Sequence, residues 1–451
     1  MSEKKFPKTA LVLMPPFWPN MPPLSLIHLG AFLQSHGQNI SLYDLNNKIF
    51  NLADEQLKKE WLVSSNARLE ENMPRILKEK FSQILEQIET ELSGFQILGF
   101  SCYRSNLKTT FSLINNLKRK RPDIRIVLGG PEIIRQYFKN KDVFQNKEFS
   151  TADLIVVGEG EKPFYEFMQG EKEEKAAYFE EIPNLNVYNP IDGYKRLDMR
   201  QYPRKDSVSL LLSRGCLKSC RFCSERLLYK EVRTRSIENI ITEIERHLRK
   251  NNVQSFVFHD SMLNMNLARL ERLCEAIIKK FGSIHWEAQM GIRVEMSDQL
   301  LARIAQSGCY NIFIGLESGC DNTLDEMRKG FTSMDALMFF KKLKKAGLSF
   351  GVSLIVGFPG ETKEDCEESL RFLIENKEYI PKIEQINPFV HYEGTDTRPE
   401  DDYSNQAQIV ERTRFFIDEL RRNNFKMTKA FINNLIIAAE FYGRDPIDDC
   451  C

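Results

Sequence analysis

The stretch SRGCLKSCRFCSER, residues 213–226, carries three cysteines in the spacing Cys-x3-Cys-x2-Cys. Basic and aromatic residues stand between Cys216, Cys220 and Cys223, and the next cysteine along the chain is Cys274. The whole chain has 10 cysteines among 451 residues, which is far below the density of a disulfide-stapled scaffold. In such a chain, clustered cysteines indicate a metal or redox centre rather than disulfides.

The cysteine stretch follows directly after SVSLLLS (207–213), an apolar segment of strand character. Similar segments then alternate with amphipathic helices, and the first helix carries isoleucines on one face behind Ser236 as its N-cap. The further strand candidates are SFVFHD (255–260), HWEAQM (285–290), NIFIGLE (311–317), FGVSLIVG (350–357) and EQINPFV (384–390). This alternation predicts a partial (β/α)6 barrel of the TIM type over residues 207–400, with its chemistry on the loops that follow the strands.

Residues 1–170 alternate strand-like and helix-like segments as well, which predicts βαβ units and a parallel sheet. In an open α/β sheet, the ligand crevice lies at the carboxyl ends of the strands. We therefore expect a Rossmann-like binding domain here, although the absence of Gly-x-Gly-x-x-Gly argues against a dinucleotide. The strand candidates are TALVLMP (9–15), NISLYD (39–44), QILGFS (96–101), IRIVLGG (124–130) and DLIVVGEGE (153–161).

The sequence thus predicts an α/β chain of two domains with two further segments. Residues 171–206 combine a charged run with a stretch rich in Pro, Asn and Tyr, and we expect them to form the interdomain connection. Residues 401–451 are expected to be a short, mostly helical C-terminal segment.

Composition excludes several classes of function. The 63 basic and 63 acidic residues balance to a formal net charge of zero, so a polyanion such as nucleic acid is not expected as a general partner. No apolar run is long enough for a membrane span, and the N-terminus lacks the pattern of a signal peptide. We therefore expect a cytoplasmic protein.

Two kinds of metal centre are open to three cysteines. A structural zinc site takes four ligands, usually from two close pairs, and the stretch provides only three. His247 is expected to be packed on the apolar side of a helix rather than to act as a ligand. An iron–sulfur cluster with four irons and three thiolates leaves one iron open to another molecule. The sequence favours this cluster, with zinc as the alternative.

The pattern Cys-x3-Cys-x2-Cys after a first barrel strand, with the aromatic Phe222, resembles the radical S-adenosylmethionine (SAM) superfamily. The resemblance implies a 4Fe–4S cluster held by Cys216, Cys220 and Cys223, whose open iron chelates SAM. In that family, reductive cleavage of SAM yields methionine and a 5′-deoxyadenosyl radical. The resemblance also implies SAM contacts at successive strand ends, at Phe222, Asp260, Arg293, Glu317 and, within VSLIVGFPGET (352–362), Gly357.

A Rossmann-like domain before such a barrel is similar to the cobalamin-binding class of this superfamily. The matching stretches include LYDLN, GFSCYRSN, LGGPE and VVGEGE, and they place cobalamin contacts at Ser101, Cys102, Gly129, Gly130, Glu159 and Gly160. The Asp-x-His-x-x-Gly pattern that ligates cobalt from below is missing, because Asn46 stands in place of the histidine. The resemblance then implies a cobalamin without a histidine ligand. A small buried role for Cys102, and a domain that no longer binds cobalamin, are the alternatives.

The resemblance implies a cobalamin-dependent methyltransferase that methylates an unactivated carbon of a small-molecule or peptide substrate. A flavodoxin or ferredoxin is the expected electron donor, and no catalytic residue beyond the cofactor contacts is assigned. A radical rearrangement or oxidative cyclisation without net methyl transfer is the alternative among enzymes. A non-catalytic corrinoid or electron-transfer protein is the alternative from another class.

Overall fold

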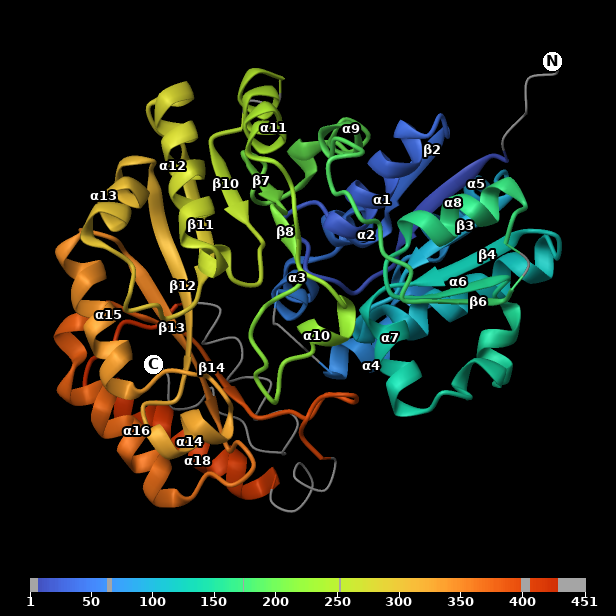
Figure 1. Cartoon of the computed structure of the whole chain (residues 1–451). Helices are drawn as coiled ribbons and strands as arrows, with labels where there is room; N and C mark the ends of the chain where they lie inside the picture. Colours follow the sequence, from blue (N-terminus) through green and yellow to red (C-terminus); the bar gives the residue numbers. More distant parts are fainter. Residues whose placement is uncertain (1–6, 63–66, 173, 251–252, 399–405, 429–451) are drawn as a thin grey trace. The chain divides into compact units, whose positions relative to one another are not determined.

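The computed structural model describes residues 7–62, 67–172, 174–250, 253–398 and 406–428 (Figure 1). The chain divides into two compact units, residues 1–206 with 227–252 and residues 207–226 with 253–451. Among the described residues, no helix combines the length and the apolar character that crossing a membrane requires. The terminal Cys450–Cys451 pair lies outside the described residues.

The first unit is built on a parallel sheet of six strands in the order β2-β1-β3-β4-β5-β6. Because β1 lies between β2 and β3, the chain changes direction across the sheet at that point, which is where an open α/β sheet forms its ligand crevice. The strands are β1 (Thr9–Leu13), β2 (Ile40–Asp44), β3 (Ile97–Ser101), β4 (Arg125–Gly129), β5 (Leu154–Val157) and β6 (Ala176–Tyr178).

Both faces of this sheet are buried, because alternate residues of each strand enter different cores. In β1, Ala10 and Val12 belong to one hydrophobic cluster, whereas Leu11 and Leu13 belong to the other. The helices that supply the rest of these cores are α1 (Leu24–Ser35), α2 (Leu45–Leu52), α3 (Glu55–Trp61), α4 (Ala67–Lys80), α5 (Ser82–Leu92), α6 (Leu107–Lys120), α7 (Pro131–Lys139) and α8 (Glu161–Gln169). The unit is therefore a three-layer α/β/α domain, which confirms the predicted Rossmann-like class.

The first unit extends further along the chain than the sequence suggests. The range 171–206, expected to be a connection, contributes the edge strand β6 and the short helix α9 (Ile191–Tyr194). The unit also includes β9 (Arg233–Thr234) and α11 (Ile237–Lys250), the helix predicted after the first barrel strand. His247 of α11 is fully buried, and its ring contacts the Tyr194 ring edge-on, as expected for a packed histidine.

The second unit has a parallel sheet of six strands in the order β14-β13-β12-β11-β10-β7. This order follows the chain, as a partial barrel requires, and all six strands lie where the sequence predicts them. They are β7 (Ser207–Leu210), β10 (Ser255–Phe258), β11 (His285–Met290), β12 (Cys309–Glu317), β13 (Phe350–Val356) and β14 (Ile383–Pro388). The pair Ser213–Arg214 forms the short β8.

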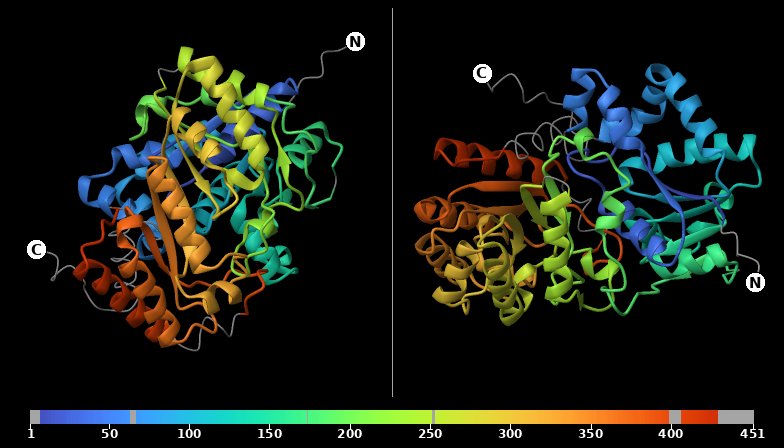
Figure 2. Two further views of the ribbon diagram at one scale, coloured as in Figure 1. Left: turned by 60° about the vertical axis from the view of Figure 1, so that its left-hand side comes forward. Right: turned by 90° about the horizontal axis from the view of Figure 1, so that it is seen from above.

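Helices cover the outer side of these strands, as Figures 1 and 2 show. They are α12 (Leu267–Phe281), α13 (Asp298–Gln306), α15 (Ser333–Lys345), α16 (Lys363–Glu375) and α18 (Gln406–Arg422), with the shorter α10 (Glu225–Leu228) and α14 (Asp321–Glu326) on loops. Helix α18 is the described part of the predicted helical C-terminal segment. Beyond it, residues 426–428 pair with Ile383, so the outer edge of β14 is not left open.

Candidate active site

The three cysteines lie on the loop that follows β7, and a buried carboxylate fixes the start of that loop. Asp260, only 2% exposed, accepts hydrogen bonds from the Leu212 amide at 3.1 Å and from the Ser213 hydroxyl. Further along, the Cys223 amide donates to the Cys220 carbonyl and the Arg221 amide to the Met327 carbonyl. The loop is thus held both by a bond within itself and by bonds to neighbouring barrel segments.

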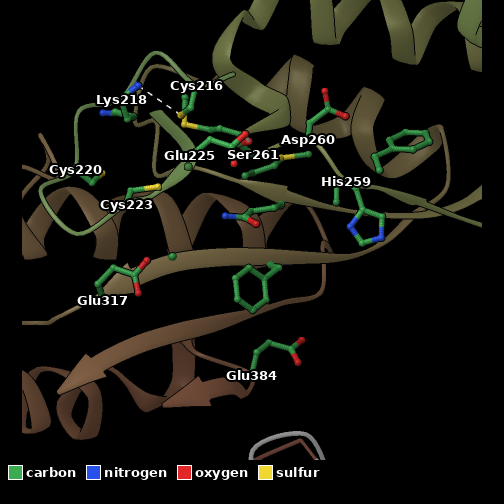
Figure 3. Close-up of a pocket in the computed structure, with 18 of the residues that line it drawn as sticks. Cys216, Lys218, Cys220, Cys223, Glu225, His259, Asp260, Ser261, Glu317 and Glu384 are labelled. Atoms are coloured by element: carbon green, nitrogen blue, oxygen red, sulfur yellow. Dashed lines mark hydrogen bonds between the residues drawn. The ribbon is translucent and has the colours of Figure 1, made fainter. Parts of the chain in front are cut away.

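The cysteine loop borders a cavity of about 560 Å³ inside the barrel (Figure 3). The cavity brings together most of the residues that the sequence proposes for the cluster and for SAM, namely Cys216, Cys220, Phe222, Cys223, Asp260 and Glu317. Strands β10, β11, β12 and β14 supply the other walls. A cavity of this size is typical of small-molecule sites.

The chemistry of the cysteines fits a cluster better than a single ion. Within the described ranges, no group of three Cys, His, Asp or Glu side chains is placed to hold one metal ion. In a four-iron cluster each thiolate binds a different iron, so the three sulfurs need not converge on one point. Burial raises the pKa of Cys216, and that of Cys223 to about 11, so both thiols must lose a proton when they bind metal.

Glu317 enters the cavity through an unusual backbone geometry at the end of β12. Its φ is +69°, in the left-handed region that side chains other than glycine rarely adopt, and the sheet register shifts between Gly315 and Glu317. A Cβ atom on Gly315 would lie 2.3 Å from Glu317 Oε1. The carboxylate therefore lies over Gly315. Its oxygens accept hydrogen bonds from Lys329 Nζ at 3.3 Å and from Ser353 Oγ at 3.4 Å.

Lys329 is a cavity residue that the sequence analysis missed. Its ammonium lies 5.7 Å from the centre of the Phe222 ring, and its carbonyl accepts a hydrogen bond from Lys218 Nζ. The turn that returns it to the cavity has positive φ at Arg328 and at Gly330. A glycine shortly after a helix is the signal that could have revealed this turn. Lys329 thus links the cysteine loop to Glu317.

The structure does not bring Arg293 or Gly357 to the cavity wall. The Arg293 guanidinium donates to the carbonyls of Asn264 and Met265 and pairs with Glu295. Gly357 has a φ of +83°, and a Cβ atom there would lie 2.6 Å from Ile409 of α18. Both residues therefore have roles in the fold, and their contacts with SAM stay predictions.

In the first unit, Cys102 and Gly130 form a packed turn at the ends of β3 and β4. Cys102 is fully buried, its amide donates to the Gly129 carbonyl, and its carbonyl accepts from the Glu132 amide. Gly130 has a φ of +107°, and a Cβ atom there would lie 2.7 Å from the Cys102 carbonyl oxygen. The glycine at 130 is thus required by the fold itself. Burial also raises the pKa of the Cys102 thiol to about 12, as expected for a small core residue.

Glu159 is engaged by an arginine of its own unit. Both its oxygens accept from the Arg233 guanidinium, at 2.7 and 2.9 Å, and one also accepts from the Ile182 amide. The two side chains are less than a tenth exposed. This buried ion pair gives Glu159 a structural role, and its contact with cobalamin stays a prediction.

The remaining candidate positions stay near the strand ends of the first sheet. Ser101 ends β3 and its carbonyl accepts from the Asn106 amide group. Gly129 ends β4 and Gly160 is the N-cap of α8, and at both positions a Cβ atom would make only ordinary contacts. These three positions are compatible with a ligand at the carboxyl ends of the strands.

Asn46, at the place of the missing histidine, is a buried structural residue. It is 1% exposed, and its Oδ1 accepts from the Phe17 amide at 2.7 Å and from the Trp61 indole at 3.1 Å. Its oxygen therefore joins the loop after β1 to α3.

Comparison with known proteins agrees with this fold and site. The radical SAM superfamily model matches residues 210–373, which include the cysteine loop and most of the barrel. An uncharacterised methyltransferase of Pyrococcus horikoshii is 26% identical over 297 residues, which are 61% of this chain and 63% of that protein. The anaerobic magnesium-protoporphyrin IX monomethyl ester cyclase of Cereibacter sphaeroides is 25% identical over 323 residues, 65% of this chain and 50% of the cyclase.

A solved structure extends the likeness to the first unit. The radical SAM methyltransferase TsrM of Kitasatospora setae, with cobalamin and a 4Fe–4S cluster bound, superposes with a TM-score of 0.64 at 14% identity. The match covers 86% of this chain and 74% of TsrM. The fold and the site thus define a chain of two α/β units, the second of which carries three cysteines beside its cavity. The likeness to the radical SAM superfamily is thus carried in sequence by residues 210–373.

Proposed function

We propose that this chain is a radical SAM enzyme in which Cys216, Cys220 and Cys223 hold a 4Fe–4S cluster. The observation that carries the proposal is the arrangement of three cysteines, without a fourth, at the mouth of a barrel cavity that Glu317 also lines. When bound, such a cluster supplies one-electron reduction of SAM. A flavodoxin or ferredoxin is the expected source of the electron.

The protein's own residues bind and orient the reactants in this proposal. Glu317 presents a carboxylate that can accept hydrogen bonds from SAM, and Lys329 and Ser353 hold that carboxylate in place. Phe222 packs edge-on against Phe358, at 6.2 Å between ring centres, and offers an aromatic surface beside the cysteines. Asp260 acts mainly by fixing the start of the cysteine loop.

We propose further that the first unit binds cobalamin and that the enzyme transfers a methyl group to an unactivated carbon of a small molecule or peptide. The fold shared with TsrM supports this, as do Ser101 and Gly129 at the ends of β3 and β4 and Gly160 at the start of α8. Cobalamin would supply the methyl carrier. A cobalamin with no protein histidine below cobalt fits the buried, hydrogen-bonded Asn46.

Anaerobic reconstitution tests the cluster. The wild-type chain is expected to hold about four irons and four sulfides and to form 5′-deoxyadenosine from SAM under reduction. Replacing Cys216, Cys220 and Cys223 together by alanine should abolish both. The matched control replaces Cys274, Cys309 and Cys366, which are buried elsewhere in the same unit. Full iron content in the first variant, or zinc in the wild-type site, would show that the proposal is wrong.

An oxidative cyclisation without methyl transfer is the second candidate, because the Cereibacter sphaeroides relative is named as a cyclase. Mass spectrometry of ligands that copurify under anaerobic conditions provides candidate substrates. Incubation of each with SAM carrying a labelled methyl group then separates the two reactions. A labelled product indicates methyl transfer, whereas an unlabelled product that has lost hydrogen indicates cyclisation.

A further inference from the structure

The sheet of the second unit is open on one side. Its order places β7 at one edge and β14 at the other, with the four remaining strands between them. In a closed barrel, the first and last strands pair through their backbones. Here the described residues of β7 and β14 form no such ladder, and residues 426–428 take the outer edge of β14 instead. Contacts outside the sheet must therefore hold these two sides together.

The loops that follow the two edge strands meet at Asp396. The Asp396 amide donates to the carbonyl of Arg221, which lies between Cys220 and Cys223, at 3.0 Å. The Asp396 carboxylate pairs with Arg226, three residues after Cys223, at 3.6 Å. The loop after β14 is thus bonded to the cysteine loop on both sides of Cys223.

The same carboxylate reaches a third loop. Asp396 Oδ2 accepts a hydrogen bond from Arg328 at 2.8 Å, and it is also the oxygen that pairs with Arg226. Arg328 directly precedes Lys329, whose ammonium donates to Glu317. One carboxylate therefore joins the cysteine loop to the turn that brings Lys329 into the cavity.

The loop after β14 holds Asp396 in place through its own bonds. The Thr395 amide donates to the Tyr392 carbonyl, and Gly394 within this turn has a φ of +87°. The hydroxyls of Thr395 and Thr397, on either side of Asp396, lie 2.9 Å apart. The position of Asp396 is therefore set by its own loop, and the cysteine loop is attached to it.

An apolar cluster joins the same loops. Phe222 of the cysteine loop packs edge-on against Phe358, which follows β13, and Phe358 packs edge-on against Phe389, which follows β14. Met327, on the turn before Arg328, is a buried member of this cluster. The loops are thus joined by an apolar contact and by the charges around Asp396, and a change of charge at Asp396 tests the second part alone.

We propose that Asp396 is a positioning residue that holds the cysteine loop across the open side of the barrel and so determines how firmly the loop keeps its cluster. This role rests on the proposed function, because the cysteine loop is the segment proposed to bind the 4Fe–4S cluster. Without the carboxylate, Arg226 and Arg328 are two like charges with no anion between them. The loop end after Cys223 then separates more often from the loop after β14, and iron is lost faster.

The test measures how fast the reconstituted, full-length chain loses iron to a ferrous chelator after reduction under anaerobic conditions. Asp396→Asn keeps the size of the side chain and the backbone amide and removes only the charge. Exposed ion pairs are individually weak, but this charge serves two of them, so iron loss should be roughly three-fold faster or more. Iron loss at the wild-type rate would overturn the proposal.

Two further variants separate positioning from a general loss of stability. Asp298→Asn is the matched control, because it removes an exposed carboxylate that pairs with Lys345 elsewhere in the same unit, and it should leave iron loss unchanged. Asp396→Glu keeps the charge and should restore slow iron loss. Equal acceleration in Asp298→Asn, or fast iron loss in Asp396→Glu, would overturn the proposal.

A double-mutant cycle shows whether Asp396 acts through the cysteine loop. Arg226→Met should itself speed iron loss, and adding Asp396→Asn to it should then have a smaller effect than Asp396→Asn has alone. Fully independent effects of the two changes would show that Asp396 does not act through Arg226 and would overturn the proposal.

The wild-type preparation separates this role from the proposed function. Its iron content and its formation of 5′-deoxyadenosine from SAM are measured before the chelator is added. About four irons and SAM cleavage, together with wild-type iron loss in Asp396→Asn, would refute the positioning role and leave the enzyme class standing. A wild-type chain whose three cysteines hold no cluster would refute the proposed function and the positioning role with it.

Discussion

At the scale of single residues, Glu317 depends on the glycine two positions before it. The carboxylate occupies the space that a Cβ atom on Gly315 would take, and Gly315 has no positive φ that would by itself disfavour alanine. Gly315→Ala should therefore displace the carboxylate and weaken SAM binding roughly ten-fold, the loss expected for one charged hydrogen bond. Iron content should stay unchanged. Equilibrium binding of SAM to the reconstituted chain measures the effect.

A matched substitution controls for the general effect of replacing glycine. Gly160→Ala in the first unit adds a methyl group that makes only ordinary contact with Leu29, so it should leave SAM affinity unchanged. If Gly315→Ala binds SAM as tightly as the wild type, Glu317 is not a SAM contact.

Glu361 makes the stability of the barrel depend on pH. Burial raises the pKa of Glu361 to about 7, and hydrogen bonding to the Gly357 amide together with the charge of Arg412 offsets only part of that rise. A raised pKa means that the folded state binds the proton more tightly than the unfolded state. The stabilisation is therefore complete below pH 4.5 and is lost as the pH rises toward 7.

Glu361→Gln should remove this dependence, because glutamine keeps the neutral form at every pH. Thermal unfolding should show wild type and variant alike at pH 5, with the variant more stable at pH 8 by at most about 3 kcal/mol. Glu364→Gln, on the exposed first turn of α16, is the control and should leave the pH dependence as it is. Equal unfolding curves for Glu361→Gln and wild type at pH 8 would refute the raised pKa.

The sequence predicts some of the cavity residues and misses others. The cysteines and Glu317 could be found because they stand at fixed places after strands, where parallel strand ends converge. The other polar residues of the cavity, Glu287, Asn311 and Glu384, could not be found in this way. In the sequence they are only polar interruptions within strand segments. Arg293 also follows a strand, but in the structure its guanidinium donates to backbone carbonyls, so its contact with SAM stays a prediction.

At the scale of elements, helix α18 packs against the loop that follows β13. Ile409 lies over Gly357, and Arg412 donates to the Glu361 carbonyl at 2.7 Å. Gly357→Ala should destabilise the barrel by roughly 1–3 kcal/mol, through the clash with Ile409 and through the strain of alanine at positive φ. Chemical denaturation of the full chain measures this change.

A double-mutant cycle separates the two causes. In an Ile409→Ala background the clash is gone, so adding Gly357→Ala should cost less than it does alone, and only the backbone strain should remain. An unchanged cost in that background would show that α18 does not pack on Gly357.

Strand β6 shows why some elements cannot be predicted from the sequence. It is three residues long and follows a charged run, so neither its length nor its pattern distinguishes it from a connection. Its place is set by pairing with β5, a contact between segments that sequence periodicity does not reveal. Strands β1, β5 and β13, by contrast, are largely apolar runs, and the sequence predicts them.

At the scale of the whole molecule, the proposed reaction depends on a cofactor in the first unit as well as in the barrel. The chain matches only 63% and 50% of the length of the two curated relatives, so their activities do not transfer to it as a whole. The first unit therefore needs its own test. Gly130→Val is unsuitable for that purpose, because the added side chain would strike the Cys102 backbone and disturb the sheet whether or not a ligand binds.

The decisive test is cobalamin binding by the intact chain under anaerobic conditions. We expect a bound cob(II)alamin whose electron paramagnetic resonance spectrum shows no nitrogen splitting from a protein imidazole. The physical reason is that Asn46 stands in place of the histidine and its side-chain oxygen accepts hydrogen bonds from Phe17 and Trp61. The Cys102 thiol is buried. The spectrum of Asn46→Ala should match that of the wild type, provided that circular dichroism shows an intact fold. Imidazole splitting would refute the arrangement without histidine. An intact chain that binds no corrinoid would refute the methyl-transfer proposal and leave the proposed radical SAM chemistry of the barrel to be judged by its own test.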